Sequence, residues 1–585
     1  MAERPVFQIG LTMAGAVSAG AYTAGVVDFL FEALDAIEDV RAGRPTDYLK
    51  GGFVDEKPII DPPHDVKIRA MSGTSAGSMA TAIVATILGT RVPPVTSKRD
   101  VTRSDPTNNP LYDCWVSDIH YDKLLSTSDL ENGKEVVSLL NSSPLEGIVG
   151  KALKYADKTD YLRPYIDDPL QIFFCVSNLR GVRYALHLDT ASGAPTDYQM
   201  SLHADWVEFK WSKTAPPAQN GGVQLTPARE AGEWQKLGNA ALASGAFPVG
   251  LSARALKRDF IDYEQRKWFD RAGNSEQLFP PIDKRAAFGD KGEYDFVNAD
   301  GGVFNNEPLE LCRAALAGGA DKLNKRDPLI ADRGVILIDP FPNLTDLENP
   351  YDPEPHRQLL DVVKKLLGAM VAQARFKIDE LALAASPNVA SRYAIMPVRY
   401  EKNDRVAKYS IACGSLGGFG GFLSKAFRHH DFMLGRRNCQ RFLARHFVLP
   451  ADFESSTFNS LFKDWKDKDF TSKFQCVLPS EAGDPFAGKK YLPIVPLLGK
   501  LASDKYTEMP PWPTKPYDLK KDELKEAVLA RADALKDSLV QQYKPSTTLK
   551  VGLASYWWLK KKSWVDRFVI STVSADLDKR GIQPS

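Results

Sequence analysis

The chain has 585 residues, of which 43% are hydrophobic and 25% charged, and its formal net charge is +1. These values are ordinary for a soluble globular protein, and the length allows more than one structural unit, which excludes a disordered or fibrous main state. Such a small net charge gives no overall electrostatic attraction to nucleic acid, so no nucleic-acid partner is expected. Any attraction to a membrane would have to be local.

The six cysteines are widely spread, and none lies in a CxxC pattern or beside histidines at zinc-ligand spacing. Neither a disulfide framework nor a structural metal is indicated, and a reducing, cytoplasmic setting is expected. No run of about eighteen or more apolar residues occurs, which argues against a membrane-spanning helix. The start of the chain imitates a signal peptide but lacks a strongly apolar centre, so we expect it to belong to the fold.

The first predicted elements alternate between strands and helices. We expect a strand over 6–11, a helix over 21–37, a strand over 66–70 that ends at Ser72-Gly73, and a helix over 76–88. Four more strand-like runs follow, at 171–176, 183–188, 294–298 and 334–338. Strands that alternate with helices predict an α/β fold with a largely parallel central sheet.

The α/β unit is predicted to end near the Pro-Phe-Pro sequence at 340–342. This boundary gives a first domain over 1–345 and a mainly helical extension over 346–585, which would pack on the first domain or cover it. The extension begins with apolar residues at helical spacing over 359–371.

A Gly-Thr-Ser-Ala-Gly sequence at 73–77 matches the GxSxG pattern. In this pattern the serine occupies a sharp strand-to-helix turn, and small neighbours such as Gly73 and Gly77 permit strained backbone angles and expose the hydroxyl. The helix N-terminus that follows adds partial positive charge beside a developing oxyanion. A glycine-rich turn without chemistry has the same pattern, but the position between a predicted strand and a small-residue helix favours Ser75 as a nucleophile.

A serine hydroxyl needs a base, and the usual base is histidine. None of the eight histidines follows an acid at the end of a predicted strand. Asp300-Gly301-Gly302, in contrast, follows at the end of the strand-like run 294–299, and sites in open α/β sheets form where strands end. Alone, this tripeptide is more often a plain turn. Combined with Ser75 in one sheet, it predicts that Asp300 is the base.

Together, Ser75 in Gly-Thr-Ser-Ala-Gly and Asp300 in Asp-Gly-Gly resemble the patatin-like phospholipase family, whose members pair a GxSxG serine with a DGG or DGA aspartate. Residues 10–26 are similar to the family's first strand, oxyanion loop and helix start, and Ala-Ser-Gly-Ala-Phe-Pro at 243–248 is similar to its A-S-x-A-x-P segment. These landmarks cover about residues 6–310. A weaker resemblance to large bacterial members lies in His-Asp-Phe-Met-Leu-Gly-Arg-Arg-Asn at 430–438.

The resemblance implies a patatin-like α/β/α sandwich and an oxyanion hole made by the backbone amides of Gly15, Ala16 and Val17. The family pattern G-G-G-x-[KR]-G is changed here, because only Gly15 and Gly20 keep their glycines and Ala19 replaces the basic residue. Backbone amides can still line an oxyanion hole if the angles suit alanine and valine. The altered loop puts in doubt which amide donates.

The activity that the resemblance implies is hydrolysis of a phospholipid or another acyl-ester lipid by a Ser75–Asp300 dyad, with no metal or organic cofactor. Two alternatives stay open at this point. One is a Ser-His-Asp esterase that uses one of the histidines, and the other is a catalytically inert lipid-binding or scaffolding protein, which the altered glycine loop would suit.

Two stretches are candidates for peripheral membrane contact. Residues 416–423 form an apolar, glycine-rich run that leads to basic residues, and residues 556–564 mix tryptophans with lysines. Such mixtures favour the headgroup region of a membrane. Packing in the core is the commoner explanation for aromatic residues, and we favour it for both stretches.

Overall fold

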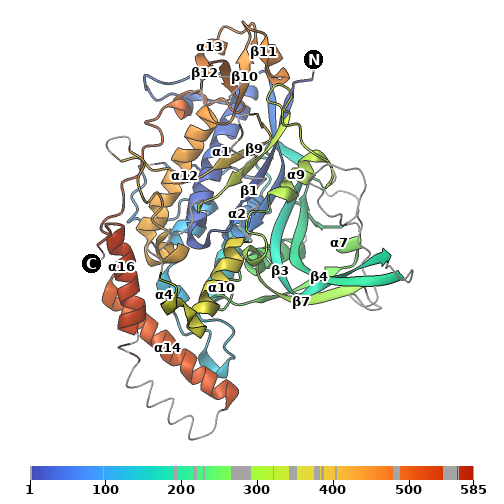
Figure 1. Cartoon of the computed structure of the whole chain (residues 1–585). Coiled ribbons are helices and arrows are strands. Elements are labelled where there is room, and N and C mark those ends of the chain that lie inside the picture. Colours follow the sequence, from blue (N-terminus) through green and yellow to red (C-terminus); the bar gives the residue numbers. More distant parts are fainter. Residues whose placement is uncertain are drawn as a thin grey trace.

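The computed structural model describes most of the chain (Figure 1). The residues that it does not describe are 1–2, 97, 190–194, 215–220, 228–230, 265, 267–291, 321, 342–351, 374–382, 384–385, 387, 402–404, 479–487, 545–560, 562, 564 and 584–585.

The centre of the fold is a largely parallel mixed sheet. Its main path runs in the order β5-β4-β3-β2-β1-β8-β9, and β7 joins it beside β3 and carries β6. The five strands from β3 to β9 along this path are parallel to their neighbours, whereas β4 and β7 run antiparallel to β3. The strands are β1 Val6–Met13, β2 Asp65–Thr74, β3 Ile166–Asp189, β4 Pro195–Trp211, β5 Val223–Leu225, β6 Arg254–Asp259, β7 Glu293–Asp300, β8 Arg333–Ile338 and β9 Arg392–Ile395.

Helices cover both faces of this sheet. On one face, α1 (Gly20–Arg41), α2 (Ala76–Thr86) and α6 (Ala231–Ser244) pack in the main hydrophobic core. On the other face, α9 (Leu309–Ala317) packs in a second core on residues that include Ala70 and Cys175. Buried apolar side chains on alternate sides of the strands explain why both faces need covering. The predicted α/β class is confirmed.

A long helix from the C-terminal part of the chain completes the first face. Helix α12 (Lys425–Arg445) lies alongside α1 (Figure 1). Two glycines let the helices meet closely: a Cβ on Gly25 would lie 1.9 Å from the carbonyl oxygen of Phe432, and one on Gly435 would lie 2.2 Å from that of Tyr22. The Gly435 of the 430–438 sequence is therefore a packing position.

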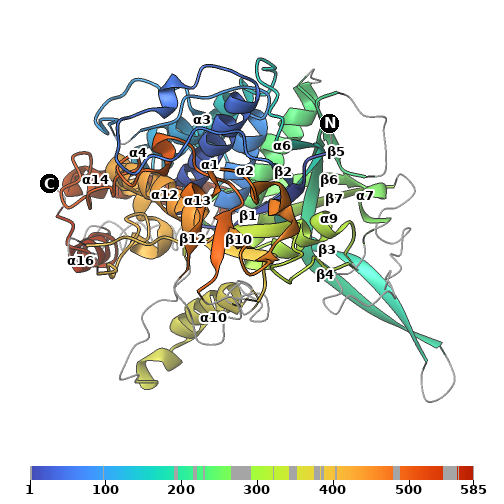
Figure 2. The same cartoon turned by 90° about the horizontal axis from the view of Figure 1, so that it is seen from above.

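Two predictions about the sheet are corrected. The separate strands expected at 171–176 and 183–188 form one strand, β3, which with β4 makes a ribbon that extends beyond the helices (Figure 2). The sheet also does not end before residue 345, because β9 pairs with β8 in parallel. The expected boundary between 1–345 and 346–585 therefore cuts through one sheet and one core.

The remaining helices and strands are shorter or lie at the periphery. The helices are α3 Pro110–Tyr112, α4 Tyr121–Leu124, α5 Ser143–Leu153, α7 Ile261–Glu264, α10 Leu359–Gln373, α13 Thr471–Phe474, α14 Lys521–Tyr543 and α16 Ser571–Lys579, with a π-helical segment η3 at Asp113–Ser117. A small antiparallel sheet contains β10 Val448–Asp452, β11 Thr457–Phe458, β12 Cys476–Val477 and β13 Lys490–Pro493.

One described helical stretch, Val17–Arg41, is long and apolar enough to cross a membrane by length and composition. The sequence-based argument against any such helix was therefore too strong. However, 89% of its most apolar window is buried inside the fold, as expected for the core helix of a folded domain.

Candidate active site

Ser75 occupies the turn between β2 and α2. Its backbone has φ 53° and ψ −124°, a conformation that non-glycine residues rarely adopt and that costs about 1–3 kcal/mol. The two glycines of the motif allow close approach of neighbouring chain segments: a Cβ on Gly73 would lie 2.6 Å from the Gly77 backbone, and one on Gly77 would lie 2.0 Å from the Met13 carbonyl. The predicted strained turn, with glycines on both sides, is confirmed.

The Ser75 hydroxyl donates a hydrogen bond to the Asp300 carboxylate, with 2.6 Å between Oγ and Oδ2. Asp300 is the last residue of β7, and both side chains are buried. The other carboxylate oxygen, Oδ1, accepts a 2.7 Å hydrogen bond from the Gly302 amide. The two predicted residues, 225 positions apart, therefore meet within hydrogen-bond distance.

Burial raises the pKa of Asp300 to about 6, and the hydrogen bonds from Ser75 and from the Gly302 amide oppose that rise. A carboxylate with a pKa near 6 is a better proton acceptor than an ordinary aspartate and is still mostly ionised at neutral pH. This environment suits a general base.

Ser244 belongs to the 243–248 segment, and the sequence assigned it no role of its own. In the structure it supports the Ser75 backbone. Its Oγ accepts a 2.9 Å hydrogen bond from the Ser75 amide and donates to the Cys175 carbonyl at 2.6 Å. Ser78 adds a 2.8 Å contact between hydroxyls. Ser244 thus fixes the strained backbone of Ser75 to β3.

The glycine loop differs from its prediction at one position. The Gly15 amide donates to the Asn306 carbonyl at 3.2 Å, so it is already engaged and does not serve as a free oxyanion donor. Asn306 follows the Asp300 turn and carried no signal in the sequence. Its side chain also packs closely on the loop, and a Cβ on Gly15 would lie 2.3 Å from its Oδ1.

The amides of Ala16 and Val17 remain candidates for the oxyanion hole. They stand at the start of the short helix η1 (Val17–Ala19), where backbone amides have no partner within the helix. Val17 has φ 47°, a left-handed conformation that is strained for a β-branched residue. The loop therefore has a glycine-like backbone conformation at a valine.

Among the hydrogen bonds of the described residues, none joins a histidine to Ser75 or Asp300. His429, the candidate beside a second histidine, bonds through Nδ1 to the Tyr112 hydroxyl at 2.7 Å. No group of three or more His, Cys, Asp or Glu side chains within the described ranges is placed to hold a metal ion.

An apolar pocket with about 510 Å³ of empty space lies beside Ser75. Val17 and Met79 line it together with three phenylalanines from distant segments, Phe247, Phe419 and Phe422. The rings of Phe247 and Phe419 pack edge to face with centroids 5.2 Å apart. The pocket suits an apolar group attached to a carbonyl at Ser75.

The apolar run 416–423 forms part of this pocket. It folds into two short turns, η7 (Ser415–Gly418) and η8 (Gly420–Leu423), which are tied to the glycine loop. Ser18 donates from its hydroxyl to the Gly418 carbonyl and accepts from the Gly421 amide at 3.0 Å. The other candidate stretch, 556–564, lies outside the described residues except at 561 and 563.

No protein-family model matches the chain. The chain is 34% identical over 594 residues to "Uncharacterized protein y4iI" of Sinorhizobium fredii, an alignment that covers 94% of this chain and 78% of that protein. This chain belongs to the family of y4iI. Because the alignment spans nearly all of the chain, the y4iI family shares sequence on both sides of residue 345 and not only around the GxSxG motif.

Proposed function

We propose that the protein is a serine-dependent lipid acyl hydrolase that releases a fatty acid through a Ser75–Asp300 dyad. The observation that carries the proposal is the 2.6 Å hydrogen bond between a serine in a strained strand-to-helix turn and a buried carboxylate. The apolar pocket beside Ser75 favours a lipid ester over a polar substrate. The same features resemble those of patatin-like phospholipases.

In the proposed mechanism, Asp300 accepts the hydroxyl proton as Ser75 Oγ attacks the ester carbonyl. The tetrahedral oxyanion is held by backbone amides of Ala16 and Val17 and by the amide of Ala76, which begins α2 and has no partner within that helix. The alcohol leaves with the proton, and the acyl group stays on Ser75. Asp300 then takes a proton from water as the water attacks the acyl-enzyme, and it returns that proton to Ser75 Oγ as the fatty acid leaves.

The test compares fatty acid release from a mixed phospholipid, lysophospholipid and acylglycerol preparation, with products identified by mass. Ser75→Ala and Asp300→Asn are each expected to lower the rate by at least about a hundredfold, since each removes an essential part of the nucleophile. Two matched controls should keep wild-type rates: Ser252→Ala, next to the pocket-lining Leu251, and Asp295→Asn, an exposed carboxylate on the same strand as Asp300.

Two results would contradict the proposal. Wild-type rates in Ser75→Ala would exclude this serine as the nucleophile. No fatty acid from any lipid, with a correctly folded wild-type protein, would favour an inert lipid-binding role.

A further inference from the structure

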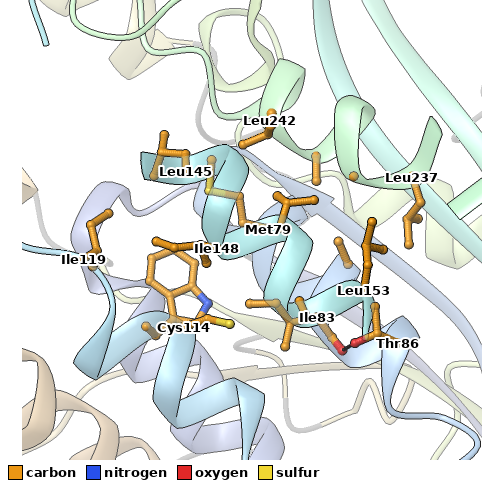
Figure 3. Close-up of a pocket in the computed structure, with 16 residues that line it drawn as sticks. Met79, Ile83, Thr86, Cys114, Ile119, Leu145, Ile148, Leu153, Leu237 and Leu242 are labelled. Atoms are coloured by element: carbon orange, nitrogen blue, oxygen red, sulfur yellow. Dashed lines mark hydrogen bonds between the residues drawn. The ribbon is translucent and has the colours of Figure 1, made fainter. Parts of the chain in front are cut away.

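A second apolar pocket adjoins the one at Ser75 (Figure 3). The space inside it, including the part that is open to solvent, is about 560 Å³. Four residues line both pockets: Met79, Trp115, Ile119 and Leu145. The two pockets therefore meet about one helical turn from Ser75, beside the flexible side chain of Met79.

Three helices, α2, α5 and α6, form most of the walls of this second pocket, and Cys114 and Trp115 of η3 complete them. From α2 the lining proceeds from Met79 to Thr86, on one face of the helix. From α5 it proceeds from Leu145 to Leu153, and from α6 it proceeds backwards from Leu242 to Leu237. In Figure 3, Thr86, Leu153 and Leu237 lie together at the end opposite Leu145. The pocket is thus elongated along α2.

The lining carries no charged side chain. Its only hydroxyl, on Thr86, donates to the Ile83 carbonyl at 2.7 Å and so is already satisfied. The indole N–H of Trp115 has no partner among the described residues, and it is a neutral donor. A headgroup or sugar would lose its hydrogen bonds here, whereas methylene groups gain by leaving water.

We infer that this second pocket binds the hydrocarbon tail of the acyl group, so that the preferred substrate is an ester of one unbranched chain of about a dozen carbons. The inference rests on the proposed function, because the chain is oriented by its carbonyl at Ser75. With a rise of about 1.5 Å per residue, Thr86 lies about 16 Å along α2 from Ser75. Carbon–carbon bonds of about 1.5 Å advance an extended chain by about 1.25 Å per carbon, which gives about 13 carbons.

The same geometry predicts where a block would shorten the chain. Ala82 lies about 10 Å along α2 from Ser75, equivalent to about eight carbons. In Ala82→Phe the added ring should therefore fill the pocket beyond that depth. In Thr86→Phe the ring should fill only its far end. Gly147→Phe is the matched control, because Gly147 is exposed on α5 and a Cβ there meets no atom within 4 Å.

The experiment measures kcat/KM for p-nitrophenyl butyrate, octanoate, dodecanoate and palmitate. For wild type and Gly147→Phe, kcat/KM should rise about two- to fourfold per methylene up to dodecanoate and then level off. Ala82→Phe should keep the butyrate and octanoate rates and lose at least about tenfold on dodecanoate. Thr86→Phe should keep dodecanoate and lose only the longer chain. If Ala82→Phe does not fold, Ala82→Leu places a smaller block at the same depth of the pocket.

Two outcomes separate this inference from the proposed function. If Ala82→Phe lowers all four esters equally or none, the tail lies elsewhere, although Ser75 still acts as a nucleophile. If no ester is cut at all, the binding of dodecanoate is measured by calorimetry. Binding to wild type that is lost in Ala82→Phe supports a fatty-acid site in this pocket. No binding to wild type, or equal binding to both proteins, contradicts it.

Discussion

Asp300 combines burial with only two hydrogen bonds to its carboxylate, from Ser75 and from the Gly302 amide. Neither donor carries a charge, so the two hydrogen bonds offset the desolvation of the carboxylate only in part and its pKa rises to about 6. Asp205 is also buried, but the Arg266 guanidinium beside it helps to hold the pKa of that carboxyl below its ordinary value. The missing cation is what distinguishes Asp300 as a base.

Because the Asp300 carboxylate is buried without a charged partner, we expect it to lower the free energy of unfolding near neutral pH. The folded-state pKa of about 6 lies above the unfolded value of 3.8. Ionisation of Asp300 therefore lowers the free energy of unfolding, by the full amount above pH 6 and by nothing below pH 4. Asp300→Asn should therefore raise the free energy of unfolding by about 3 kcal/mol at pH 8, and the gain should shrink as the pH falls from 6 to 4.

The measurement is urea denaturation of wild type and Asp300→Asn at several pH values. Asp295→Asn, which removes an exposed carboxylate from the same strand, should show no comparable gain. If Asp300→Asn instead lowered the free energy of unfolding at pH 8, the ionised carboxylate would stabilise the fold, which contradicts a raised pKa and the role of a base.

At the scale of elements, several turns and helix contacts need a glycine, because a Cβ there would collide with the backbone of a neighbouring segment. Gly435→Ala should lower the free energy of unfolding by about 2–4 kcal/mol, because its new methyl would lie 2.2 Å from the Tyr22 carbonyl and push α12 from α1. Gly147→Ala, in an open position of α5, should instead stabilise by up to about 1 kcal/mol. Thermal or urea unfolding measures both, and equal effects would contradict the close helix contact.

The sequence was sufficient for the elements around Ser75, since β1, β2, α1 and α2 each follow a clear hydrophobic period next to a motif. It was also sufficient for the meeting of Ser75 and Asp300, because both end strands of one sheet. The sequence did not predict the role of Asn306, whose backbone carbonyl accepts the hydrogen bond from the Gly15 amide. Backbone acceptors have no residue preference, so no pattern could identify this contact.

The continuity of β3 was missed for a related reason. Asn178 and Gly181 interrupt the apolar alternation, and the pattern indicated two strands. In the fold, Asn178 Oδ1 accepts hydrogen bonds from the amides of Arg180 and Gly181, so the irregular stretch keeps its polar groups satisfied while the chain direction continues. The Asn178 contacts are local, but β4 pairs with both halves of the strand, and local propensity does not encode this long-range pairing.

At the scale of the whole molecule, the C-terminal region is part of the domain that carries the site. It contributes β9 to the central sheet, α12 to the core beside α1, and Phe419 and Phe422 to the pocket. Arg436 of α12 pairs with both Asp28 and Glu32 of α1 in a buried cluster. Removal of the partner of a buried charge typically costs about 3–5 kcal/mol.

A fragment of residues 1–345 should therefore not fold, although it contains Ser75, Asp300 and the glycine loop. It would leave Asp28 and Glu32 without their arginine and expose the apolar face of α1. We expect no cooperative thermal transition by circular dichroism and rapid proteolysis, whereas the full chain should melt cooperatively. A cooperative transition in the fragment would show that residues 346–585 are an independent unit.

The central claim is that Asp300 activates Ser75. The most direct measurement is the rate at which a fluorophosphonate probe labels the protein as a function of pH, with the modified peptide identified by mass. The account predicts an adduct on Ser75, a labelling rate that rises with pH and is half-maximal near pH 6, and a rate at least about a hundredfold lower in Asp300→Asn. An adduct on another residue, or equal labelling of Ser75 in wild type and Asp300→Asn, would contradict it.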